Sequence, residues 1–361
     1  MFVAVLASLP PRETGRREMI EDASPPDYLR ADGYLKTLIG ARALASALEF
    51  GLVDVLVEGD QDLATISRLT GLGQRSASIL VQLLVGAGVV RRHDALVGLD
   101  ARFREVLAYR DLIETKLELC ALLLPDLADG FTRLLADRDG FMASSRVFDL
   151  FRYDLCLDPT PENLQHTRRW MRLTTVLTRY EAAPFLDLLP CDRFLRALDI
   201  GGNSGELARH LCQRNPQLRV TVFDLPVVCY IGAEFLSEAP ERERIEFLPG
   251  DALRDPLPRG VDLVCFKSIL HDWPEASARE FLARAATALA PGGILAIFER
   301  GPLELERLPG YADIPILLFA GFYRSPVYYA RVLEHLGLES IDLVRVDLDA
   351  PFHLVTARKP G

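Results

Sequence analysis

The sequence predicts an α/β protein in which a doubly wound, Rossmann-like parallel sheet follows an N-terminal helical domain of the winged-helix type. Three observations predict this fold class. Strand-like apolar runs alternate with helical stretches from about residue 193 onward, which is typical of a parallel sheet covered by helices. A glycine cluster, "DIGGNSG" (199–205), joins the first of these strands to a helix. Earlier in the chain, apolar residues recur at helical spacing.

Composition limits the classes of function. The chain has 361 residues, of which 49% are hydrophobic and 25% are charged. This predicts a well-packed soluble protein with two domains, or one large domain with an appendage. The net charge of -10 argues against nucleic acid as a partner, because such binding needs clustered Lys and Arg. No run approaches the ~20 apolar residues of a membrane helix, so we expect no membrane partner.

The cysteines and the first residues bear on location. The six cysteines are scattered and form no CxxC pair. This argues against a metal site and a disulfide framework, and it indicates the reducing cytoplasm. The opening "MFVAVLASLP" is apolar but short and has no basic residue before it. We therefore interpret it as part of a disordered leader rather than as a targeting signal.

We divide the chain after residues 34, 110 and 190. Residues 1–34 are rich in proline and charge and are expected to be a mobile leader. In 35–110, "DLATISRLTGLGQRSASILVQLLVGAGVV" predicts a helix, a turn and a helix, and "VVRRHDALVGLD" a small hairpin. The second helix, Gln74 to Gly86, has one Arg and is otherwise mostly apolar or small. Such a helix suits packing against a partner subunit better than reading DNA.

Residues 111–190 are expected to form a helical linker and substrate lid. Two stretches, "LIETKLELCALLLPDLADGFTRLL" and "ENLQHTRRWMRLTTVLTRYEAAPFLDLL", have long helical patterns. Aromatic and Met residues occur there, among them Phe151, Tyr153, Trp170 and Met171. Ordinary core packing and lining of a substrate pocket both remain open for them.

Residues 191–361 are expected to form the catalytic domain with a seven-stranded sheet. The strand candidates are "FLRALDI", "RVTVFDL", "RIEFLPGD", "VDLVCFKSIL", "GILAIFER", "IDLVRVDL" and "PFHLVTARK". Only a few residues separate the last two, which is too short for a parallel crossover. We therefore expect the last strand to run antiparallel, at one side of the sheet.

The glycine cluster indicates which nucleotide is bound. Gly201, Gly202 and Gly205 fall at the carboxyl end of a strand, where ligands bind in such sheets. Their spacing does not fit G-x-G-x-x-G, and Asp199 lies directly beside them. A carboxylate disfavours a pyrophosphate and favours a sulfonium or an α-amino group. The cluster therefore predicts a positively charged nucleoside without phosphate.

Two further acids end the next two strands. Asp224 ends "TVFDLP" and can accept hydrogen bonds from ribose hydroxyls. Asp251 ends "LPGDAL", where it or a backbone neighbour can meet an adenine. We include the following residues, Leu225 and Ala252, in this predicted site. A single Asp at a strand end is often only a turn or cap residue, but three in order with the glycine cluster indicate one binding site.

Together these motifs resemble a known family. The order "LDIGGNSGEL", "VTVFDLP", "FLPGDAL", "FKSILHDWPE", "ALAPGGILAIFE" is similar to class I S-adenosylmethionine-dependent O-methyltransferases, in particular the caffeic acid and acetylserotonin O-methyltransferase group with its bacterial secondary-metabolite enzymes. The resemblance covers about residues 35 to 360. It implies S-adenosyl-L-methionine as cofactor, a homodimer formed by the winged-helix domain, and a small apolar aromatic or polyketide-like acceptor.

The resemblance also implies roles for individual residues. It makes His271 the general base that deprotonates the acceptor, Glu299 the acid that orients the imidazole, and Lys267 a neighbour of the adenine. Acceptor contacts are expected from Trp170 and Met171, and from Phe319 and Tyr323 of "YADIPILLFAGFYRSPVYY".

The residues themselves support a base at His271. It lies at the carboxyl end of the fourth strand, and neutral imidazole is available near pH 7 because its ordinary pKa is about 6.5. Asp272 is open to two interpretations. It could act in catalysis, or it could cap the next helix together with Glu275, with Pro274 in the first turn.

One position departs from the family pattern. Relatives commonly have a second acid near the histidine, in a "GxERT"-like segment, whereas Gly321–Ser325 has Tyr323 there. Tyrosine supplies no negative charge at neutral pH. Either the acceptor is already acidic, or Glu299 suffices, or the protein uses the cofactor for hydroxylation, decarboxylation or cyclisation without methyl transfer. A nucleoside-sensing winged-helix regulator is a third class of function, against which the acidic charge and the apolar second helix argue.

Overall fold

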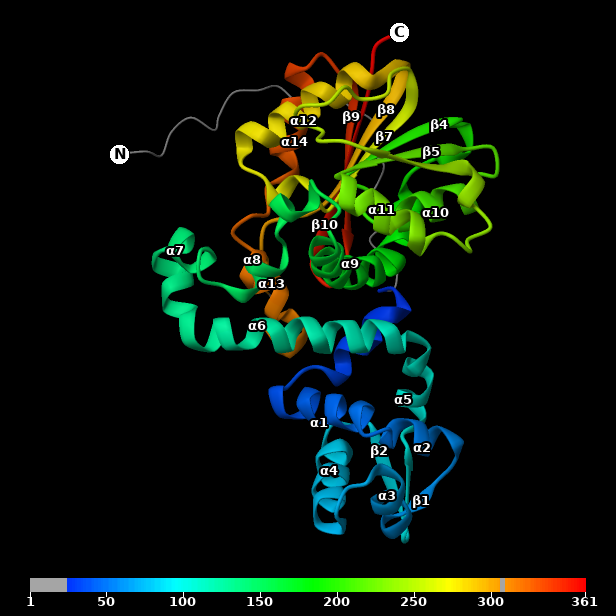
Figure 1. Cartoon of the computed structure of the whole chain (residues 1–361), viewed down its shortest axis with the longest axis vertical. Helices are drawn as coiled ribbons and strands as arrows, with labels where there is room; N and C mark the ends of the chain where they lie inside the picture. The colour runs from blue at the N-terminus through cyan, green and yellow to red at the C-terminus, as the bar shows by residue number, and fades with distance from the viewer. Residues whose placement is uncertain (1–24, 306–308) are drawn as a thin grey trace, which may run out of the picture.

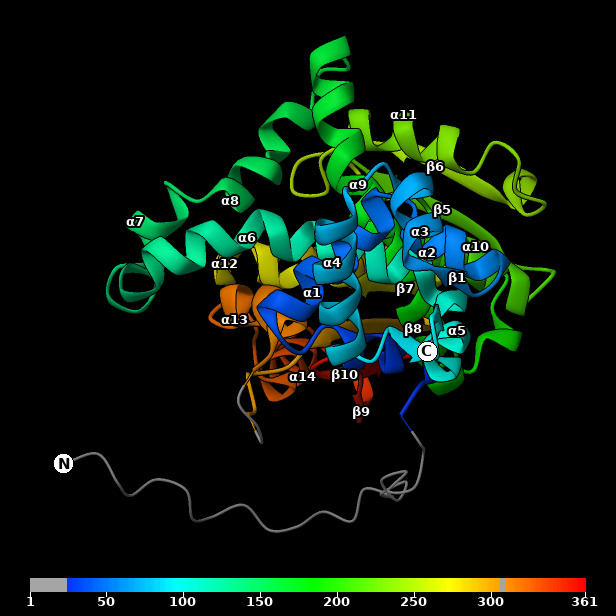
Figure 2. The same ribbon diagram turned by 90° about the horizontal axis from the view of Figure 1, so that it is seen from below.

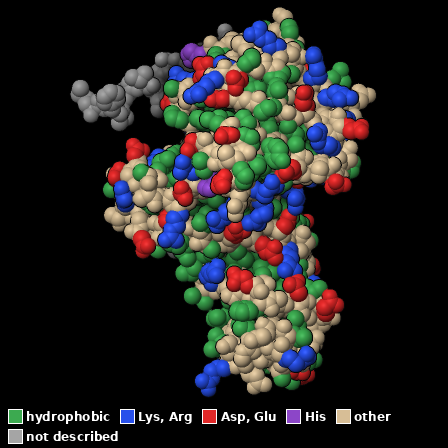
Figure 3. Space-filling model, in the orientation of Figure 1, with side chains coloured by type: hydrophobic (Ala, Val, Ile, Leu, Met, Phe, Trp, Pro, Cys, Tyr) green, Lys and Arg blue, Asp and Glu red, His purple; other side chains and the backbone are tan. Residues whose placement is uncertain are grey.

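The computed structural model describes residues 25–305 and 309–361. An N-terminal helical domain lies at one end of the molecule and an α/β domain at the other, and the long helix α6 runs between them (Figure 1). From below, α1 to α4 lie over α6, and α7 projects away from the sheet (Figure 2). On the face drawn in Figure 3, Lys and Arg side chains are interspersed with Asp and Glu and form no basic stripe.

The N-terminal domain is a winged helix, as predicted. Helices α3 and α4 form the helix-turn-helix, and Gly71 in left-handed conformation (φ 72°) ends α3. Strands β2 and β3 pair antiparallel as the wing. The elements are η1 (Asp27–Tyr34), α1 (Leu38–Glu49), α2 (Leu52–Glu58), β1 (Gln61–Asp62), α3 (Leu63–Thr70), α4 (Gln74–Gly86), β2 (Val90–His93) and β3 (Leu96–Leu99).

The expected leader differs from the structure over residues 27–34. These residues form the 3-10 helix η1, in which Tyr28 and Ala31 are buried. Asp32 of the same helix forms an ion pair of 2.6 Å with Lys116 of α6. Burial of an aromatic ring and an ion pair hold this segment against the linker, although its composition predicts mobility. The rest of the expected leader, 1–24, lies outside the described residues.

The linker region consists of helices, and α6 and α9 match the two long helical patterns. Pro161 begins α9 at a position where its missing N–H costs no hydrogen bond. The Thr160 side chain caps the same end by accepting from Asn163 N. The elements are α5 (Ala101–Val106), η2 (Leu107–Tyr109), α6 (Arg110–Ala136), α7 (Arg138–Met142), α8 (Arg146–Leu150), η3 (Tyr153–Cys156) and α9 (Pro161–Leu188).

The C-terminal α/β domain contains the expected seven-stranded sheet, in the order β6-β5-β4-β7-β8-β10-β9. Strands β4 to β8 pair in parallel. The last strand, β10, is antiparallel to both of its neighbours, β8 and β9, which confirms the predicted antiparallel pair. The strands are β4 (Arg196–Ile200), β5 (Arg219–Asp224), β6 (Ile245–Pro249), β7 (Val261–Lys267), β8 (Leu289–Arg300), β9 (Glu339–Asp347) and β10 (Pro351–Arg358).

Helices cover both faces of this sheet. Apolar residues of α9 and α10 pack on one face, and those of α12 and α14 on the other, so that the central strands β4, β7 and β8 are almost wholly buried. The remaining elements are η4 (Cys191–Arg193), α10 (Glu206–Arg214), α11 (Pro226–Phe235), η5 (Arg242–Arg244), η6 (Leu270–Asp272), α12 (Glu275–Ala288), η7 (Tyr311–Asp313), α13 (Ile314–Phe319) and α14 (Pro326–His335). No helix among the described residues is long and apolar enough to cross a membrane.

Candidate active site

The glycine bend, residues 200–205, connects β4 to α10. Gly201, Asn203 and Gly205 have φ values of 69°, 55° and 75°, a region that glycine and asparagine tolerate best. A Cβ atom on Gly205 would lie 2.8 Å from Leu236 and 2.9 Å from Phe247. The bend therefore needs its glycines both for backbone conformation and for close packing, and its backbone comes near any ligand at the end of β4.

Two carboxylates lie beside the bend. Asp199 is 1% exposed, and its Oδ2 has no hydrogen-bond partner. A Cβ atom on Gly202 would lie 2.5 Å from this oxygen, so glycine keeps the space beside it open. Asp224 accepts hydrogen bonds of 2.8 Å from the backbone N–H groups of Asn203 and Leu225.

These carboxylates are poised for a cation. Burial, with the nearby Asp224 charge, raises the pKa of Asp199 to about 7. Burial also raises the pKa of Asp224 to about 6, although its two backbone hydrogen bonds oppose the shift. Among the described residues, neither acid forms an ion pair with a Lys, Arg or His side chain, so burial dominates both shifts. An unpaired oxygen and an open backbone fit the positively charged nucleoside that the sequence predicts.

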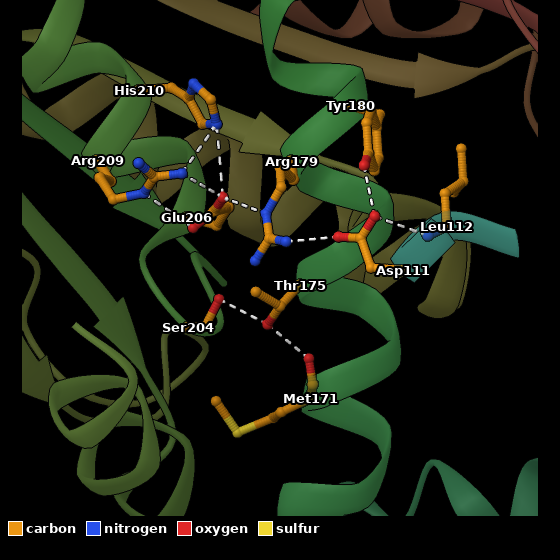
Figure 4. A network of polar contacts seen from close by, with 10 residues as sticks. All are labelled: Asp111, Leu112, Met171, Thr175, Arg179, Tyr180, Ser204, Glu206, Arg209 and His210. Atoms are coloured by element: carbon orange, nitrogen blue, oxygen red, sulfur yellow. Dashed lines mark hydrogen bonds and ion pairs between the residues drawn. The ribbon is translucent and has the colours of Figure 1, made fainter. Parts of the chain in front are cut away.

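Helix α9 holds the glycine bend from the linker side (Figure 4). The hydroxyls of Thr175 and Ser204 are 2.8 Å apart, and Asn203 Nδ2 donates to Thr174 Oγ1 at 3.0 Å. In the same network Arg179 reaches Glu206, the first residue of α10, at 3.3 Å. The sequence analysis missed these residues, because a threonine pair in a helix carries no local signal for a partner that lies 29 residues away.

The other predicted cofactor residues lie at the same edge of the sheet. Unlike Asp199 Oδ2, the side chains of Asp251 and Lys267 have partners within the protein. Asp251 Oδ1 accepts from Leu253 N at 2.9 Å, which is turn geometry, and Ala252 is 9% exposed. Lys267 forms an ion pair with Glu181 of α9. Glu181 also binds Arg300, at the end of β8, at 2.6 Å. A buried glutamate that the sequence analysis did not select thus joins α9 to the ends of β7 and β8.

We call residues 268–273 the catalytic loop, after the role proposed for His271 below. Glu299 holds the His271 ring. The distance from His271 Nδ1 to Glu299 Oε2 is 2.6 Å. The second oxygen, Oε1, accepts from the backbone N–H groups of Ile269 at 2.8 Å and Leu270 at 2.7 Å. Glu299 therefore orients the imidazole and the loop together, and it leaves Nε2 as the nitrogen that faces other groups.

Asp272 does not cap the next helix. Helix α12 begins at Glu275 after Pro274, with no side-chain hydrogen bond at its cap, which corrects the capping interpretation. Instead, Asp272 Oδ1 lies 3.3 Å from His271 Nε2, and Tyr153 donates to Oδ2 at 2.7 Å. The spacing of Asp272 and Glu275 resembles a capping pair, but the 3-10 turn η6 directs the carboxylate back toward the histidine.

The charges around His271 stabilise its protonated form. Burial opposes protonation, but the carboxylates of Asp272 and Glu299 outweigh it and raise the pKa of His271. Burial raises the pKa of Asp272. For Glu299 burial is outweighed by His271 and the two backbone N–H groups, so the pKa of this acid is lowered. The imidazole thus has a carboxylate near each nitrogen.

The segment after α13 completes the surroundings of His271. The Tyr323 ring meets the His271 ring edge-on, with centroids 5.4 Å apart. Arg324 donates to the carbonyl oxygen of Leu270 at 2.6 Å and to that of Trp273, and so clamps both ends of η6. Tyr323 places a ring beside His271, and Asp272 is the second carboxylate near it.

Trp170, Met171 and Phe319 belong to an apolar region next to this loop. Trp170 and Met171 are buried, at 4% and 0% exposure, and the indole Nε1 of Trp170 has no partner. Phe151 lies 5.9 Å from Trp170 and 6.3 Å from Phe319 between ring centroids. We call Phe148, Phe151, Tyr153, Trp170 and Phe319 the aromatic cluster. Among the described residues, no group of His, Cys, Asp and Glu is arranged to hold a metal ion.

Comparisons with known proteins agree with this geometry. Residues 146–338 match the family model described as an O-methyltransferase domain. The chain is 31% identical over 281 residues to the 3-hydroxy-5-methyl-1-naphthoate 3-O-methyltransferase of Streptomyces sahachiroi, covering 74% of this chain and 75% of that one. It is 28% identical over 356 residues to the tetracenomycin polyketide synthesis 8-O-methyl transferase of Streptomyces glaucescens, covering 93% and 99%.

Solved structures show the same fold. Human N-acetylserotonin methyltransferase, in complex with S-adenosylmethionine, superposes with a TM-score of 0.70 at 20% identity, covering 94% of this chain and all of that one. The mitomycin 7-O-methyltransferase gives a TM-score of 0.66 at 24% identity, covering 88% and 94%. The relatives do not favour the use of the cofactor without methyl transfer. The chain belongs to the O-methyltransferase family and is an enzyme that depends on S-adenosylmethionine.

Proposed function

We propose that the protein transfers a methyl group to the hydroxyl of an apolar aromatic acceptor, with His271 as the general base. One observation carries this assignment: Glu299 Oε2 holds His271 Nδ1 at 2.6 Å. The proton of the acceptor is then taken by Nε2, the nitrogen that lies 3.3 Å from Asp272 Oδ1. The loop lies at the carboxyl ends of the strands, on the same side as the glycine bend, where ligands of such sheets bind. Glu299 and Asp272 support the base from either side.

The chemistry follows from this arrangement. When bound, S-adenosylmethionine supplies a methyl group that its sulfonium activates for displacement. His271 Nε2 accepts the acceptor's O–H proton as the oxygen becomes the nucleophile. The resulting imidazolium is stabilised by Glu299 at Nδ1, as a triad acid does, and by the charge of Asp272. A second acid at position 323 is therefore not needed for base strength.

The proposed cofactor residues are those of the glycine bend and the neighbouring strand ends. The unpaired oxygen of Asp199 suits the α-amino group, and Asp224 suits the ribose hydroxyls. Asp251 and Lys267 lie at the same edge. Asp251 already accepts a hydrogen bond from Leu253 N, and Lys267 already pairs with Glu181. A bound cofactor must replace these contacts or add to them. The complete proposed set is Asp199, Gly201, Gly202, Gly205, Asp224, Leu225, Asp251, Ala252 and Lys267.

The aromatic cluster supports an aromatic acceptor. Rings at centroid distances of about 6 Å offer flat apolar contact surfaces, and Met171 and Tyr323 lie in the elements that flank His271. Two relatives act, by their names, on a hydroxynaphthoate and on a tetracenomycin polyketide. We extend this acceptor class to the present enzyme, with Trp170, Met171, Phe319 and Tyr323 as contact residues, in secondary metabolism.

We also propose a division of labour along the chain, with residues 35–110 as a dimerisation domain, 111–190 as linker and lid, and 191–361 as the catalytic domain. Helices α1 and α4 carry exposed apolar side chains: Leu38, Ile39, Ile79 and Leu83 are 43%, 61%, 55% and 40% exposed. A second copy of the chain would bury them.

The dimer can be tested by light scattering, which should give twice the chain mass of 40.2 kDa. The double variant Ile79→Asp/Leu83→Asp should be monomeric. Six free, buried cysteines suit a reducing cytoplasm.

The reaction is tested directly. The enzyme is incubated with S-adenosylmethionine and a panel of hydroxynaphthoates, naphthols and anthraquinone phenols, and S-adenosylhomocysteine and methyl ethers are measured together. We expect equal amounts of both products for at least one phenol and none for its preformed methyl ether. Consumption of an acceptor without S-adenosylhomocysteine would overturn methyl transfer.

A further inference from the structure

Tyr153 connects the linker to the catalytic loop. It lies in η3, between α8 and α9, and its hydroxyl donates to Asp272 Oδ2 at 2.7 Å across a sequence separation of 119 residues. The ring stacks on Trp273 with centroids 6.1 Å apart and planes at 14°. The rings of Tyr153 and Trp170 meet edge-on, with centroids 5.8 Å apart. Two aromatic neighbours therefore fix where the hydroxyl points.

The hydrogen bond decides the orientation of the Asp272 carboxylate. The terminal torsion of an aspartate is broad and roughly two-fold, so a carboxylate without a partner samples many orientations. With Oδ2 held by Tyr153, Oδ1 is directed to His271 Nε2 at 3.3 Å. This nitrogen is the one that Glu299 leaves available.

We propose that Tyr153 is a positioning residue for methyl transfer: its hydroxyl fixes Asp272 so that Oδ1 faces Nε2 of His271. The inference rests on the proposed role of His271 as general base. Tyr153 acts through Asp272 and does not itself exchange a proton.

The charged neighbourhood gives this arrangement a measurable signature. The titratable and charged groups around His271 and Asp272 are Tyr153 from η3, Glu299 and Arg300 from β8, and Tyr323 and Arg324 from the segment after α13. The Tyr153 hydrogen bond opposes the effect of burial on the pKa of Asp272. Without this donor, the pKa of Asp272 rises and its carboxylate is no longer directed to Nε2. Asp272 then stabilises the protonated form of His271 less.

The first test does not depend on an acceptor. The chain has six histidines, and His271 is assigned by the resonance that disappears in His271→Ala. Imidazole NMR titrations then compare the wild type with Tyr153→Phe, which keeps the ring stack and removes the hydroxyl. We expect the His271 midpoint to move to lower pH in Tyr153→Phe, because Asp272 then stabilises the imidazolium less. An unchanged midpoint in a folded variant overturns the proposal.

A matched control is available in the same part of the chain. Tyr180 also donates from a linker element to an aspartate, with 2.5 Å from its hydroxyl to Asp111 Oδ1 (Figure 4). Tyr180→Phe loses the same kind of bond away from His271 and should leave the His271 midpoint unchanged. An equal shift in both variants would mean a general loosening of the linker and would contradict the assignment.

Activity supplies the second test. It uses a panel phenol that the wild type methylates. With this substrate, Tyr153→Phe should lower kcat about tenfold, as expected for losing a hydrogen bond to a charged group, and leave the Kd of S-adenosylmethionine unchanged. The rising limb of the pH profile, which reports deprotonation of His271, should move to lower pH. In an Asp272→Ala background, Tyr153→Phe should have no further effect.

The outcomes separate the two proposals. Additive losses of kcat in the double variant would show that Tyr153 has a packing role alone. A loss of kcat by the same factor at every pH would show the same. A wild type that methylates no phenol would instead contradict the proposed function, while the NMR titration would still report whether Tyr153 orients Asp272. Should Tyr153→Phe not fold, Asp272→Asn tests the same contact from its other side and should lower the His271 midpoint.

Discussion

The glycine bend and the catalytic loop both use buried carboxylates, but they satisfy them in opposite ways. At the bend, Asp199 has an oxygen without a partner, and burial raises its pKa to about 7. At the loop, both oxygens of Glu299 accept hydrogen bonds, and its pKa is lowered. An unsatisfied acid favours a cationic ligand at the expense of the free protein's stability, whereas a satisfied acid is organised before any ligand arrives.

We propose that this contrast separates the residues that bind the cofactor from those that act in catalysis. Changes at the bend should act mainly on the affinity for S-adenosylmethionine, and changes at the loop mainly on turnover. The predictions below test that separation.

The largest effect is expected at His271. His271→Ala should lower kcat by ~10²–10⁴-fold, because the general base is lost, and calorimetry should find the Kd of S-adenosylmethionine nearly unchanged. His335→Ala is the control, since within the described part of the chain this imidazole bonds to Arg331 O of its own helix α14. Equal losses in turnover and affinity would make His271 a structural residue and remove the distinction between the two regions.

A smaller effect is expected at Asp224, and it should appear in cofactor affinity rather than in turnover. Asp224→Ala should weaken binding of S-adenosylmethionine by roughly 10- to 100-fold, the range for losing hydrogen bonds to a charged group, while kcat at saturation changes little. Asp262→Ala is matched to it: Asp262 also accepts two backbone N–H groups, of Leu195 and Arg196, both at 2.9 Å, but at the other end of the strands. Calorimetry showing unaltered affinity would exclude Asp224 from the site.

Cofactor affinity should also depend on pH. The raised pKa values of Asp199 (about 7) and Asp224 (about 6) mean that both acids hold protons in the free protein at low pH. A cation binds the ionised forms, so the Kd should fall as pH rises through this window and level off above it. Calorimetry at pH 6.5 in two buffers of different ionisation enthalpy should detect proton release. Identical heats in the two buffers would count against these acids as cation ligands.

Neutralising a buried acid should change the free energy of unfolding with opposite signs at the glycine bend and at the catalytic loop. Asp199→Asn should raise the unfolding free energy of the free protein by on the order of 1 kcal/mol, and Glu299→Gln should lower it by a similar amount. Asp199 has a folded pKa of about 7, above the unfolded value of ~3.9. The folded state therefore holds more protons between these values, and its stability falls as pH rises across them. Thermal unfolding across this range should lose that slope in Asp199→Asn; a destabilised variant would contradict the comparison.

The smallest effect is expected where α9 meets the bend. Thr175→Val keeps the side-chain shape and removes the hydroxyl that lies 2.8 Å from Ser204. Affinity for S-adenosylmethionine should fall roughly 2- to 10-fold, as for one neutral hydrogen bond. Thr287→Val, which removes a hydroxyl bonded at 2.7 Å to Arg284 O in α12, should not change the affinity. Equal effects of the two variants would show that α9 does not support the bend.

Much of the site is visible in the sequence because its signals are local. Glycines beside Asp199, an acid at the end of the next strand, and His271 after a strand each follow from short patterns whose strand context is clear. The role of Glu299 came from the family resemblance, and its 2.6 Å contact with His271 follows once β7 and β8 pair in parallel, since their ends then lie side by side.

The sequence by itself determined the order of elements, the winged helix, the antiparallel final strand and the kind of cofactor, since periodicity, turn glycines and strand-end acids are encoded over a few residues. Only the tertiary structure decided that Asp272 faces His271 rather than capping α12, that Tyr153 and Arg324 hold the catalytic loop, and that Glu181 joins α9 to Lys267 and Arg300. These partners come from elements far apart in the chain. Which of many similar side chains meet is set by how whole layers pack, and no local pattern carries that information.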